Sequence, residues 1–464
     1  MLKPSQATKF SFRQEPEPLS RTRASLFLAA LAAVVLVVCI APAHAETLEV
    51  AVARAVATFP EIQTGAANRR AAIAAISEAR AGYFPTIDAT AGYGRARNDN
   101  VNTRSAPGGD EVTLNRREAE VTISQLVFDG GAVSSQVRLQ ESRSESAAYD
   151  LANTAQTIAL RAARAYLEVL RLRSVIEIAK ANVAVHLRTL QQVALLTEGG
   201  AARRSDSQQA EARLALARSS LTALRGQLEQ AESEYRRLIG LVAPLQMEKP
   251  AVPLERLPGS EETALEEALD GHPALKASNA ELAVARADLQ ASQTRYIPRV
   301  NLELSASQNN NVGGVPGTTS DRIAALRLRY NLFRGGADSA RIRQAEARVD
   351  RALADVAGLR NDLEREVRVA WEALQADREQ LTYLQIHAEK SADVVDAYRS
   401  QFKLGQRTLL DVLNAENELF NARSALVNGV YAVAADSYRL FAGTGRLLEV
   451  LGVALPAEAR AANN

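Results

Sequence analysis

Phe128-Asp-Gly-Gly131 occurs a second time in this chain as Phe333-Arg-Gly-Gly336, about 205 residues further along. Each copy follows residues that alternate between apolar and polar, and each precedes a long stretch that is poor in glycine and free of proline. Residues 46–240 and 261–445 repeat the same order of segments, and the proline-rich residues 241–260 join them. The chain is therefore predicted to be an internal repeat whose unit combines strands with long helices.

The glycine pair in each repeat is followed by a predicted helix of about 66 residues, 132–197 in the first copy and 337–402 in the second. At 1.5 Å per residue such a helix is about 99 Å long. Each is followed by a short glycine-containing break and a shorter predicted helix, 205–240 or 408–442. Helices of this length have no core of their own, so we expect them to pack along one another as in a coiled coil.

Each repeat also contains two segments that alternate between apolar and polar residues. In the second copy Val300, Leu302 and Leu304 alternate with Asn301 and Glu303. Segments of about 10 residues with one apolar and one polar face are typical of transmembrane barrel strands, but a half-buried strand of a soluble sheet shows the same period. The four predicted strands are 86–97, 116–128, 299–308 and 322–332.

The first 45 residues are predicted to be a secretory signal peptide. Arg21 and Arg23 precede the apolar run Ala24–Ala41, and Ala43-His-Ala45 is a small-residue cleavage site. A retained membrane anchor is the alternative. No run of about 18 apolar residues follows residue 45, so a membrane could be entered only by strands. The only cysteine, Cys39, lies inside this segment, which leaves the predicted mature chain without thiols or disulfides.

Composition and motifs exclude several classes of function. Removing residues 1–45 changes the net charge from +1 to about −2, and no basic patch points to nucleic acid. The histidines that remain, His186, His272 and His387, are scattered and have no metal-ligand spacing. The sequence contains no P-loop, nucleophile elbow or dinucleotide fingerprint. We therefore expect no cofactor, no metal and no enzymatic activity, and any energy must come from a partner.

Four strands per chain are too few to close a membrane barrel, because single-chain barrels start at about eight strands. An open sheet edge cannot lie in lipid, since its backbone groups would be unpaired. If the strands are membrane-embedded, several chains must complete one barrel, and the long helices must form a tube roughly 100 Å long. The expected fold class is α+β: a long α-helical barrel and a transmembrane β-barrel, both built jointly by several chains.

At this point the sequence resembles the TolC family of outer-membrane efflux and secretion channels. The strongest stretch is Phe402-Lys-Leu-Gly-Gln-Arg-Thr-Leu-Leu-Asp-Val-Leu-Asn-Ala-Glu-Asn-Glu-Leu-Phe-Asn-Ala-Arg423, supported by Ala81-Gly-Tyr-Phe-Pro85, Gln125-Leu-Val-Phe-Asp-Gly-Gly131 and Asn331-Leu-Phe-Arg-Gly-Gly336. The resemblance implies a homotrimer in the outer membrane of a Gram-negative bacterium, with twelve strands, four from each chain, and a periplasmic helical tube. It is closest to the type I secretion branch, whose partners are a periplasmic adaptor and an inner-membrane ABC transporter.

The resemblance also implies roles for residues near the turns between helices. Asp206 and Asp411 match aspartates that narrow the periplasmic entrance, and a ring of such carboxylates would raise their pKa values and favour cations. Arg407 and Phe402 match an Arg and a Tyr that hold the closed tip, although Phe402 lacks the hydroxyl. Asn414 stands where the family can carry another aspartate, which would weaken the ring.

Two further groups of candidate residues complete the prediction. The turns themselves are expected to dock the adaptor, and polar strand residues are expected to face the barrel lumen. The turn residues are Gly199, Gly200, Leu404 and Gly405, and the lumen residues are Glu303, Arg327 and Arg329.

Several alternatives stay open on the sequence. Thr408-Leu-Leu-Asp411 is also a capping-box pattern, and Ser205 before Asp206 is a plausible N-cap, so both aspartates could serve as helix caps. A small-molecule efflux pump, driven by protons, is the alternative to protein secretion. A periplasmic adaptor or another coiled-coil scaffold would account for the helices but not for the four strands.

Overall fold

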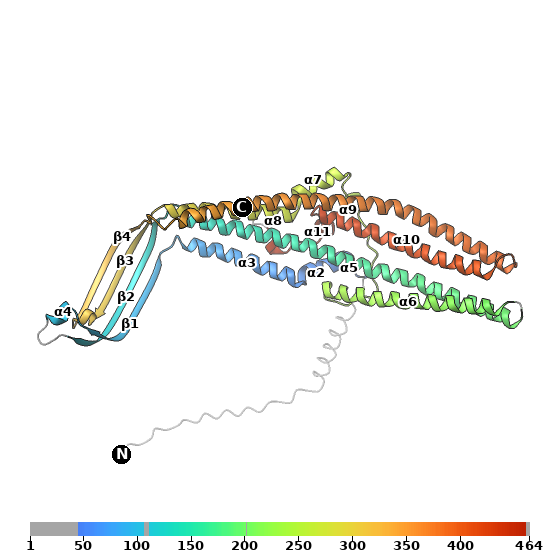
Figure 1. Cartoon of the computed structure of the whole chain (residues 1–464), viewed down its shortest axis with the longest axis horizontal. Coiled ribbons are helices and arrows are strands. Elements are labelled where there is room, and N and C mark those ends of the chain that lie inside the picture. The colour runs from blue at the N-terminus through green and yellow to red at the C-terminus, as the bar shows by residue number, and fades with distance from the viewer. Residues whose placement is uncertain (1–44, 106–110, 201, 461–464) are drawn as a thin grey trace, which may run out of the picture. The chain divides into compact units, whose positions relative to one another are not determined.

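The computed structural model describes residues 45–105, 111–200 and 202–460, so the predicted signal peptide with Cys39 lies outside it apart from residue 45. The chain divides into two units, and the second, Thr47–Asn464, contains all the elements described below. Its fold is α+β, mostly helical with one sheet, and it is built from two copies of the same strand–helix unit (Figure 1).

Each repeat contributes short and long helices. Those of the first repeat are α2 Leu48–Thr58, α3 Pro60–Ala81, α4 Val101–Arg104, α5 Ala132–Glu198 and α6 Arg204–Ile239. Those of the second are α7 Glu261–Gly271, α8 Pro273–Gln293, α9 Ala337–Lys403, α10 Leu409–Gly443 and α11 Leu447–Val450. Single 3₁₀ turns are η1 Leu254–Arg256, η2 Thr294–Tyr296, η3 Val312–Gly314 and η4 Ala457–Ala459. The strands are β1 Thr86–Asn98, β2 Val112–Phe128, β3 Arg299–Asn310 and β4 Thr318–Arg329.

Strand boundaries differ from the sequence expectation at the hairpin ends. β2 begins four residues before the expected 116 and β4 four residues before the expected 322, because backbone pairing continues to Asn98 opposite Val112 and to Asn310 opposite Thr318. β4 ends at Arg329 rather than at 332. Alternation of side chains marks the part of a strand with two distinct faces, and the pairing extends beyond it into polar sequence.

In each repeat the glycine pair forms the turn between the second strand and the long helix. Gly131 and Gly336 have φ angles of 85° and 84°, a left-handed conformation that glycine adopts without steric cost. Asp129 fixes the first of these turns, since its carboxylate accepts hydrogen bonds from the backbone N–H groups of Gly131 (2.8 Å) and Val133 (2.7 Å). The motif that reveals the repeat is therefore the joint between its strands and its long helix.

Strands and helices follow the same lateral order. The sheet is antiparallel throughout in the order β1-β2-β3-β4. The helices joined to these strands pack in the matching order α3-α5-α8-α9, so the sheet continues directly into a layer of helices (Figure 1). Farther from the sheet, α6 packs on α5, α10 packs on α9, and α10 also contacts α5. Both pairs end in tight turns at the end opposite the sheet.

The main core lies in the middle of the helical part. Tyr166, Tyr235 and Tyr438 are buried there among leucines and alanines of α2, α5, α6, α10 and α11. The Tyr166 hydroxyl donates to the carbonyl of Glu248 at 2.7 Å, which ties the segment between the repeats to α5. Among the residues described, no helix combines the length and the apolar character needed to cross a bilayer.

Candidate functional site

The predicted site residues lie at the two ends of the molecule. Asp206, Asp411, Phe402 and Arg407 lie at or next to the two tip turns, defined here as residues 199–203 and 404–407. The strand residues Glu303, Arg327 and Arg329 belong to the sheet at the other end (Figure 1). The structure thus separates the predicted entrance from the predicted lumen by the length of the long helices.

Glycines close both tip turns. Gly200 and Gly405 have φ angles of 72° and 73°, so a side chain at either position would be strained. Gly199 precedes the first of them with an ordinary negative φ and caps α5. Leu404 is 73% exposed and presents an apolar side chain at the tip.

Asp206 and Asp411 both lie in the first turn of a helix, but their hydrogen bonding differs. Asp411 and Thr408 form the expected capping box: Thr408 N–H donates to Asp411 Oδ2 (3.1 Å), and Asp411 N–H donates to Thr408 Oγ1 (3.3 Å). The N-cap of α6 is Arg203 rather than the expected Ser205, which lies inside the helix. Arg203 N–H donates to Asp206 Oδ2 at 3.2 Å, which is one of the two hydrogen bonds of a capping box. The other has no hydroxyl acceptor, because arginine lacks a hydroxyl group.

The Thr408 hydroxyl also acts on the charge of Asp411. It donates to Asp411 Oδ2 at 2.8 Å, and together with the Thr408 N–H it holds the pKa of Asp411 below its ordinary range. The carboxylate is therefore stabilised as an anion within one chain. The expected rise in pKa concerns carboxylates from several chains crowded together, and it stays a prediction.

Within the chain, Arg407 contacts an aromatic residue on α9. Its guanidinium carbon lies 4.2 Å from the centre of the Tyr398 ring, close enough for a cation–π contact, and its Nε donates to Gln401 Oε1 at 3.0 Å. Phe402 is half-buried and packs with Val193. Tyr398 precedes Phe402 by one helical turn, a spacing that the sequence alone could have suggested.

A hydrogen bond joins the two repeats near the tip. Arg213 on α6 donates from Nη2 to Asn414 Oδ1 on α10 at 2.9 Å. Asn414 was identified from the sequence only as a missing acid. In the structure it is the acceptor that connects the helix pair of one repeat to that of the other.

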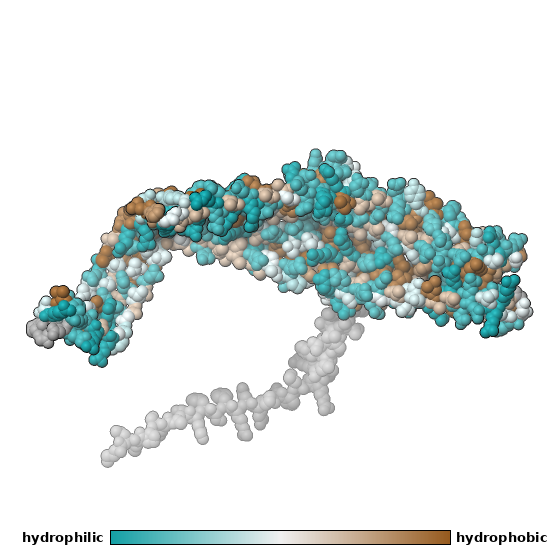
Figure 2. All heavy atoms as spheres, in the orientation of Figure 1, coloured by the Kyte–Doolittle hydropathy of each residue, from teal (hydrophilic) through white to brown (hydrophobic). Residues whose placement is uncertain are grey.

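The sheet has one apolar and one polar face. Ile87, Ile123, Leu304 and Ala324 are paired across the four strands and share one face. Glu303 and Arg327 lie diagonally across β3 and β4 on the opposite face and form an ion pair, and Arg329 follows on that same face. Figure 2 shows hydrophobic residues where the sheet meets the helices and mostly hydrophilic residues at its far end.

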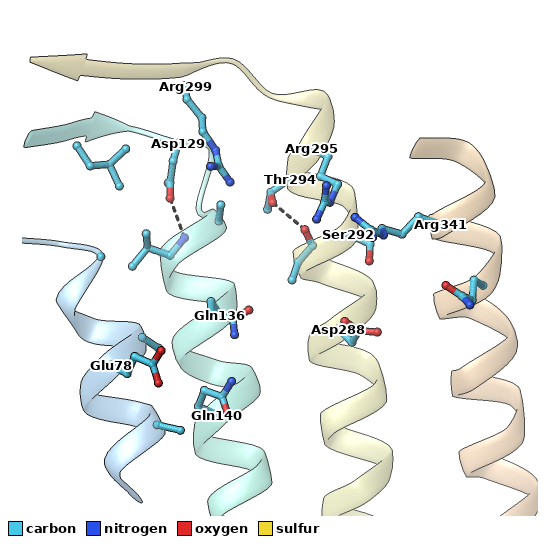
Figure 3. Close-up of a pocket in the computed structure, with 18 of the residues that line it drawn as sticks. Glu78, Asp129, Gln136, Gln140, Asp288, Ser292, Thr294, Arg295, Arg299 and Arg341 are labelled. Carbon is cyan, nitrogen blue, oxygen red and sulfur yellow. Dashed lines mark hydrogen bonds between the residues drawn. The ribbon is translucent and has the colours of Figure 1, made fainter. Parts of the chain in front are cut away.

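Where the polar face of the sheet meets the helices, the structure contains a groove of about 810 Å³, the junction groove. It is lined by the helix ends of α3, α5, α8 and α9 and by the first residues of β3 (Figure 3). Arg295, Arg299 and Arg341 point into it, and the sequence analysis did not identify them. Comparing the repeats could have found them, because their positions in the first copy are Gly82, Thr86 and Gln136.

The surroundings of His186, His272 and His387 indicate structural roles. Burial lowers the pKa of His186 and of His272, and His272 caps α8 by accepting from Ala274 N–H at 3.2 Å. His387 lies 2.9 Å from a carboxylate oxygen of Glu418 on the surface. Within residues 45–105, 111–200 and 202–460, no group of three or more His, Cys, Asp or Glu side chains could hold a metal ion.

Comparison with known proteins adds sequence relatives to this geometry. The model of the outer membrane efflux protein family matches residues 51–241 and 264–446, one segment for each repeat. The chain is 27% identical to outer membrane efflux protein BepC of Brucella suis, over 87% of the chain and 86% of BepC. It is 28% identical to outer membrane protein TolC of Vibrio cholerae, over 84% of the chain and 88% of that protein.

A third relative carries a secretion function in its name, the alkaline protease secretion protein AprF of Pseudomonas aeruginosa. The chain is 25% identical to it over 73% of the chain and 72% of AprF. The fold matches the crystal structure of the Campylobacter jejuni CmeC outer membrane channel with a TM-score of 0.76 and 16% identity, covering 86% of each chain. That likeness shows the fold alone.

These matches confirm the resemblance that the repeated motifs suggested. The protein is an outer-membrane channel with a periplasmic tunnel, a passive conduit rather than an enzyme. The chain belongs to the outer membrane efflux protein family, which includes the TolC channels.

Proposed function

We propose that three copies of this chain form the channel of a type I secretion system and export protein across the periplasm and the outer membrane. One observation carries the proposal: the four-stranded sheet has an apolar face, and its edge strands β1 and β4 have no partner in the described part of the chain. Unpaired edges are excluded from lipid. Each β4 therefore pairs with β1 of the next chain, and three chains close a barrel of twelve strands.

The dimensions of the apolar face suit a membrane. On β3 the apolar residues run from Val300 to Ala306, about 20 Å at 3.3 Å per residue, and outer-membrane barrels carry an apolar band about 25 Å tall. Exposed aromatic residues gather at the helix end of the sheet, as in the girdles of such barrels. They are Tyr83, Phe84, Tyr296, Tyr330 and Phe333.

The helical part supports the same assembly. α9 lies at the edge of the helix layer and presents large apolar side chains to solvent, among them Leu353, Val369 and Ile386. In the proposed trimer these residues pack against the next chain. Residues 1–45 serve as the signal peptide, 46–240 and 261–445 as the two repeats, 241–260 as the linker and 446–464 as the C-terminal tail.

Cross-linking the sheet edges tests the trimer. The variant carries Ala91→Cys in β1 and Ala324→Cys in β4, and it is treated in outer membranes with a bis-maleimide shorter than three strand spacings, about 14 Å. Because β1 and β4 of one chain are that far apart, the linker can join only different chains. We expect dimers and trimers on a denaturing gel and no larger species.

A matched control keeps both cysteines within one chain. Ala91→Cys with Ala119→Cys places them on paired positions of β1 and β2, where the linker closes inside the chain and leaves the monomer mobility. A ladder that continues beyond the trimer, or no ladder at all, would contradict the closed three-chain barrel.

The tip turns form the entrance in this proposal. Asp206 and Asp411 from three chains provide six carboxylates around the constriction, and Arg407 with Phe402 holds the turns closed. Gly199, Gly200, Leu404 and Gly405 form the surface on which the periplasmic adaptor docks, and the exposed Leu404 supplies an apolar contact for it. Glu303, Arg327 and Arg329 line the barrel lumen.

Conductance of the reconstituted trimer tests the entrance. The wild-type protein is expected to show small, cation-selective openings, and the Asp206→Asn/Asp411→Asn variant is expected to lose that selectivity. Unchanged selectivity in the variant would remove the two aspartates from the constriction and leave the trimeric conduit standing.

The relatives support two cargo classes. AprF is named for alkaline protease secretion, which supports protein as cargo. BepC is named for efflux, which supports a small-molecule pump as the alternative. Deleting the gene separates them: loss of a protein from the culture medium with unchanged drug susceptibility supports secretion, and the reverse result supports efflux.

A further inference from the structure

The junction groove holds more positive than negative charge. Arg295, Arg299 and Arg341 line it, and within the described chain none of the three forms an ion pair. Figure 3 shows Arg295 and Arg341 directed toward each other across the space between α8 and α9, and Arg299 extending from the start of β3 on the side of Asp129. Three guanidinium groups thus converge from two helices and a strand.

The acids of the groove do not balance these charges. Asp288 is already paired with a fourth arginine, Arg348, at 2.8 Å. Asp129 accepts hydrogen bonds from two backbone N–H groups at the start of α5 and keeps its negative charge. Glu78 lies on α3, on the far side of the groove from the arginines (Figure 3). The groove is therefore lined by four arginines and three carboxylates, an excess of one positive charge.

Like charges surround Arg295 in particular. Burial first, and then Arg341, Arg334 and Arg299, lower its pKa, while Asp338 partly opposes them. A cluster of this kind is relieved by a bound anion, and guanidinium groups bind carboxylates and phosphates through paired hydrogen bonds. The remaining lining includes the amide side chains of Gln136 and Asn301, which can complete the hydrogen bonding of an oxyanion.

The groove is continuous with the polar face of the sheet. Arg299 and Asn301 lie on the same face of β3 as Glu303, since residues two apart share a face. That face lines the lumen of the proposed conduit, so the location of the site in the export path rests on the proposed function. A trimer would carry three such grooves at one level, where the barrel meets the tube.

We propose that the junction groove binds oxyanion groups of the exported cargo, carboxylates or phosphates, through Arg295, Arg299 and Arg341. The groove would then be an anion-binding site on the export path, between the acidic entrance and the barrel. The charge excess comes from the second repeat alone, because the first repeat carries Gly82, Thr86 and Gln136 at the matching positions.

Calorimetric titration of the detergent-purified, full-length protein tests the site with two probes, sodium pyrophosphate and a hexaglutamate peptide. The test variant is Arg295→Gln/Arg341→Gln. We expect its affinity for the bound probe to fall about a hundredfold, roughly tenfold for each charged donor removed. The control is Arg343→Gln/Arg351→Gln, which removes the same charge from residues of α9 outside the groove and is expected to leave the affinity unchanged.

A third variant, Arg295→Lys/Arg341→Lys, keeps the charge and is expected to retain part of the affinity, which guards against a folding defect in the glutamine variant. Binding of hexaglutamate alone identifies a polypeptide source, and binding of pyrophosphate alone identifies a phosphate source. Absence of binding by the wild-type protein, or equal losses in the test and control variants, would overturn the site. Calorimetric titration does not require an open channel, so its result can be interpreted even if the conductance test fails.

Discussion

The long helices α5 and α9 have the same length, 67 residues, and follow the same glycine turn, yet their surroundings differ. α5 packs against α3, α6, α8 and α10 and buries residues along most of its length. α9 contacts α7, α8 and α10 and leaves one side open, with only a few buried residues. Equivalent positions in the two repeats thus lie in the interior of the chain in one case and at its edge in the other.

The repeat therefore sets the local structure of each strand–helix unit. The position of the unit in the layer of helices decides which of its faces are buried. α9, the second copy of the long helix, contains more charged residues than α5 and still exposes apolar side chains such as Leu353. A protomer edge that combines charge with apolar patches is typical of a surface that meets another subunit. Matched substitutions in the two copies can test the comparison.

The largest effect is expected from Leu151→Ala in α5. Leu151 is fully buried in the main core, and removing a buried leucine side chain costs about 2–5 kcal/mol of unfolding free energy. Leu353→Ala is the same change in α9, at a leucine that is 45% exposed in the single chain. It is expected to leave the helix content on heating unchanged but to lower the temperature at which the trimer dissociates on a gel. Equal loss of helix content in both variants would refute the inside–edge comparison.

The paired glycines of the strand–helix joints come next. A methyl group at Gly130 would lie 2.4 Å from Ile297 Cγ2, whereas none of the described atoms lies within 4 Å of a methyl group at Gly335. Both positions have positive φ, so Gly335→Ala costs about 1–2 kcal/mol from strain, and Gly130→Ala adds about 1–3 kcal/mol from overpacking. Thermal unfolding of the two variants measures the gap, and a milder effect at Gly130 would contradict the packing at that joint.

A smaller, pH-dependent effect separates Glu416 from its counterpart Glu211. Glu416 is buried and paired with Arg399 at 2.6 Å, and its pKa is raised, by burial above all, whereas Glu211 is exposed. A raised pKa means that the folded state binds the proton more tightly, so stability decreases as pH rises through the folded pKa. Glu416→Gln is therefore expected to be more stable than wild type at neutral pH and equally stable at acidic pH.

Melting curves of both glutamine variants across the acidic to neutral range measure this difference. Glu211→Gln serves as the control and is expected to follow the wild-type curve. If Glu416→Gln is less stable than wild type at neutral pH, the ion pair with Arg399 outweighs the burial of the carboxylate.

The smallest effect concerns the cap hydroxyl that only the second repeat has. Thr408→Val removes the bond that holds the pKa of Asp411 low, so the pKa is expected to rise toward its ordinary value. The lowered pKa stabilises the fold above the ordinary value, and this contribution is lost as pH falls, so the variant differs from wild type at neutral pH and not in acid. Cation selectivity recorded against pH is expected to fade at a higher pH in the variant. The Arg203→Thr change in the first repeat is the converse test.

Much of the candidate site followed from motif positions, and the rest depended on contacts between distant segments. Gly200, Gly405 and the Thr408–Asp411 box are local features, since a left-handed turn and a helix cap each require particular residues within a few positions. The Arg213–Asn414 hydrogen bond joins residues about 200 positions apart. No local pattern encodes that pairing, and from the sequence Asn414 could be described only as the absence of an acid.

The repeat, the order of strands and helices, the two faces of the sheet and the family all follow from the sequence alone. These features depend on periodicity and turn residues, which act over a few residues and recur in both copies. The folded arrangement is needed to show that α5 lies inside and α9 at the edge, that Arg407 lies over the Tyr398 ring, and that three arginines line the junction groove. Their positions depend on how four helices and four strands pack side by side, and that packing brings together residues that no local spacing relates.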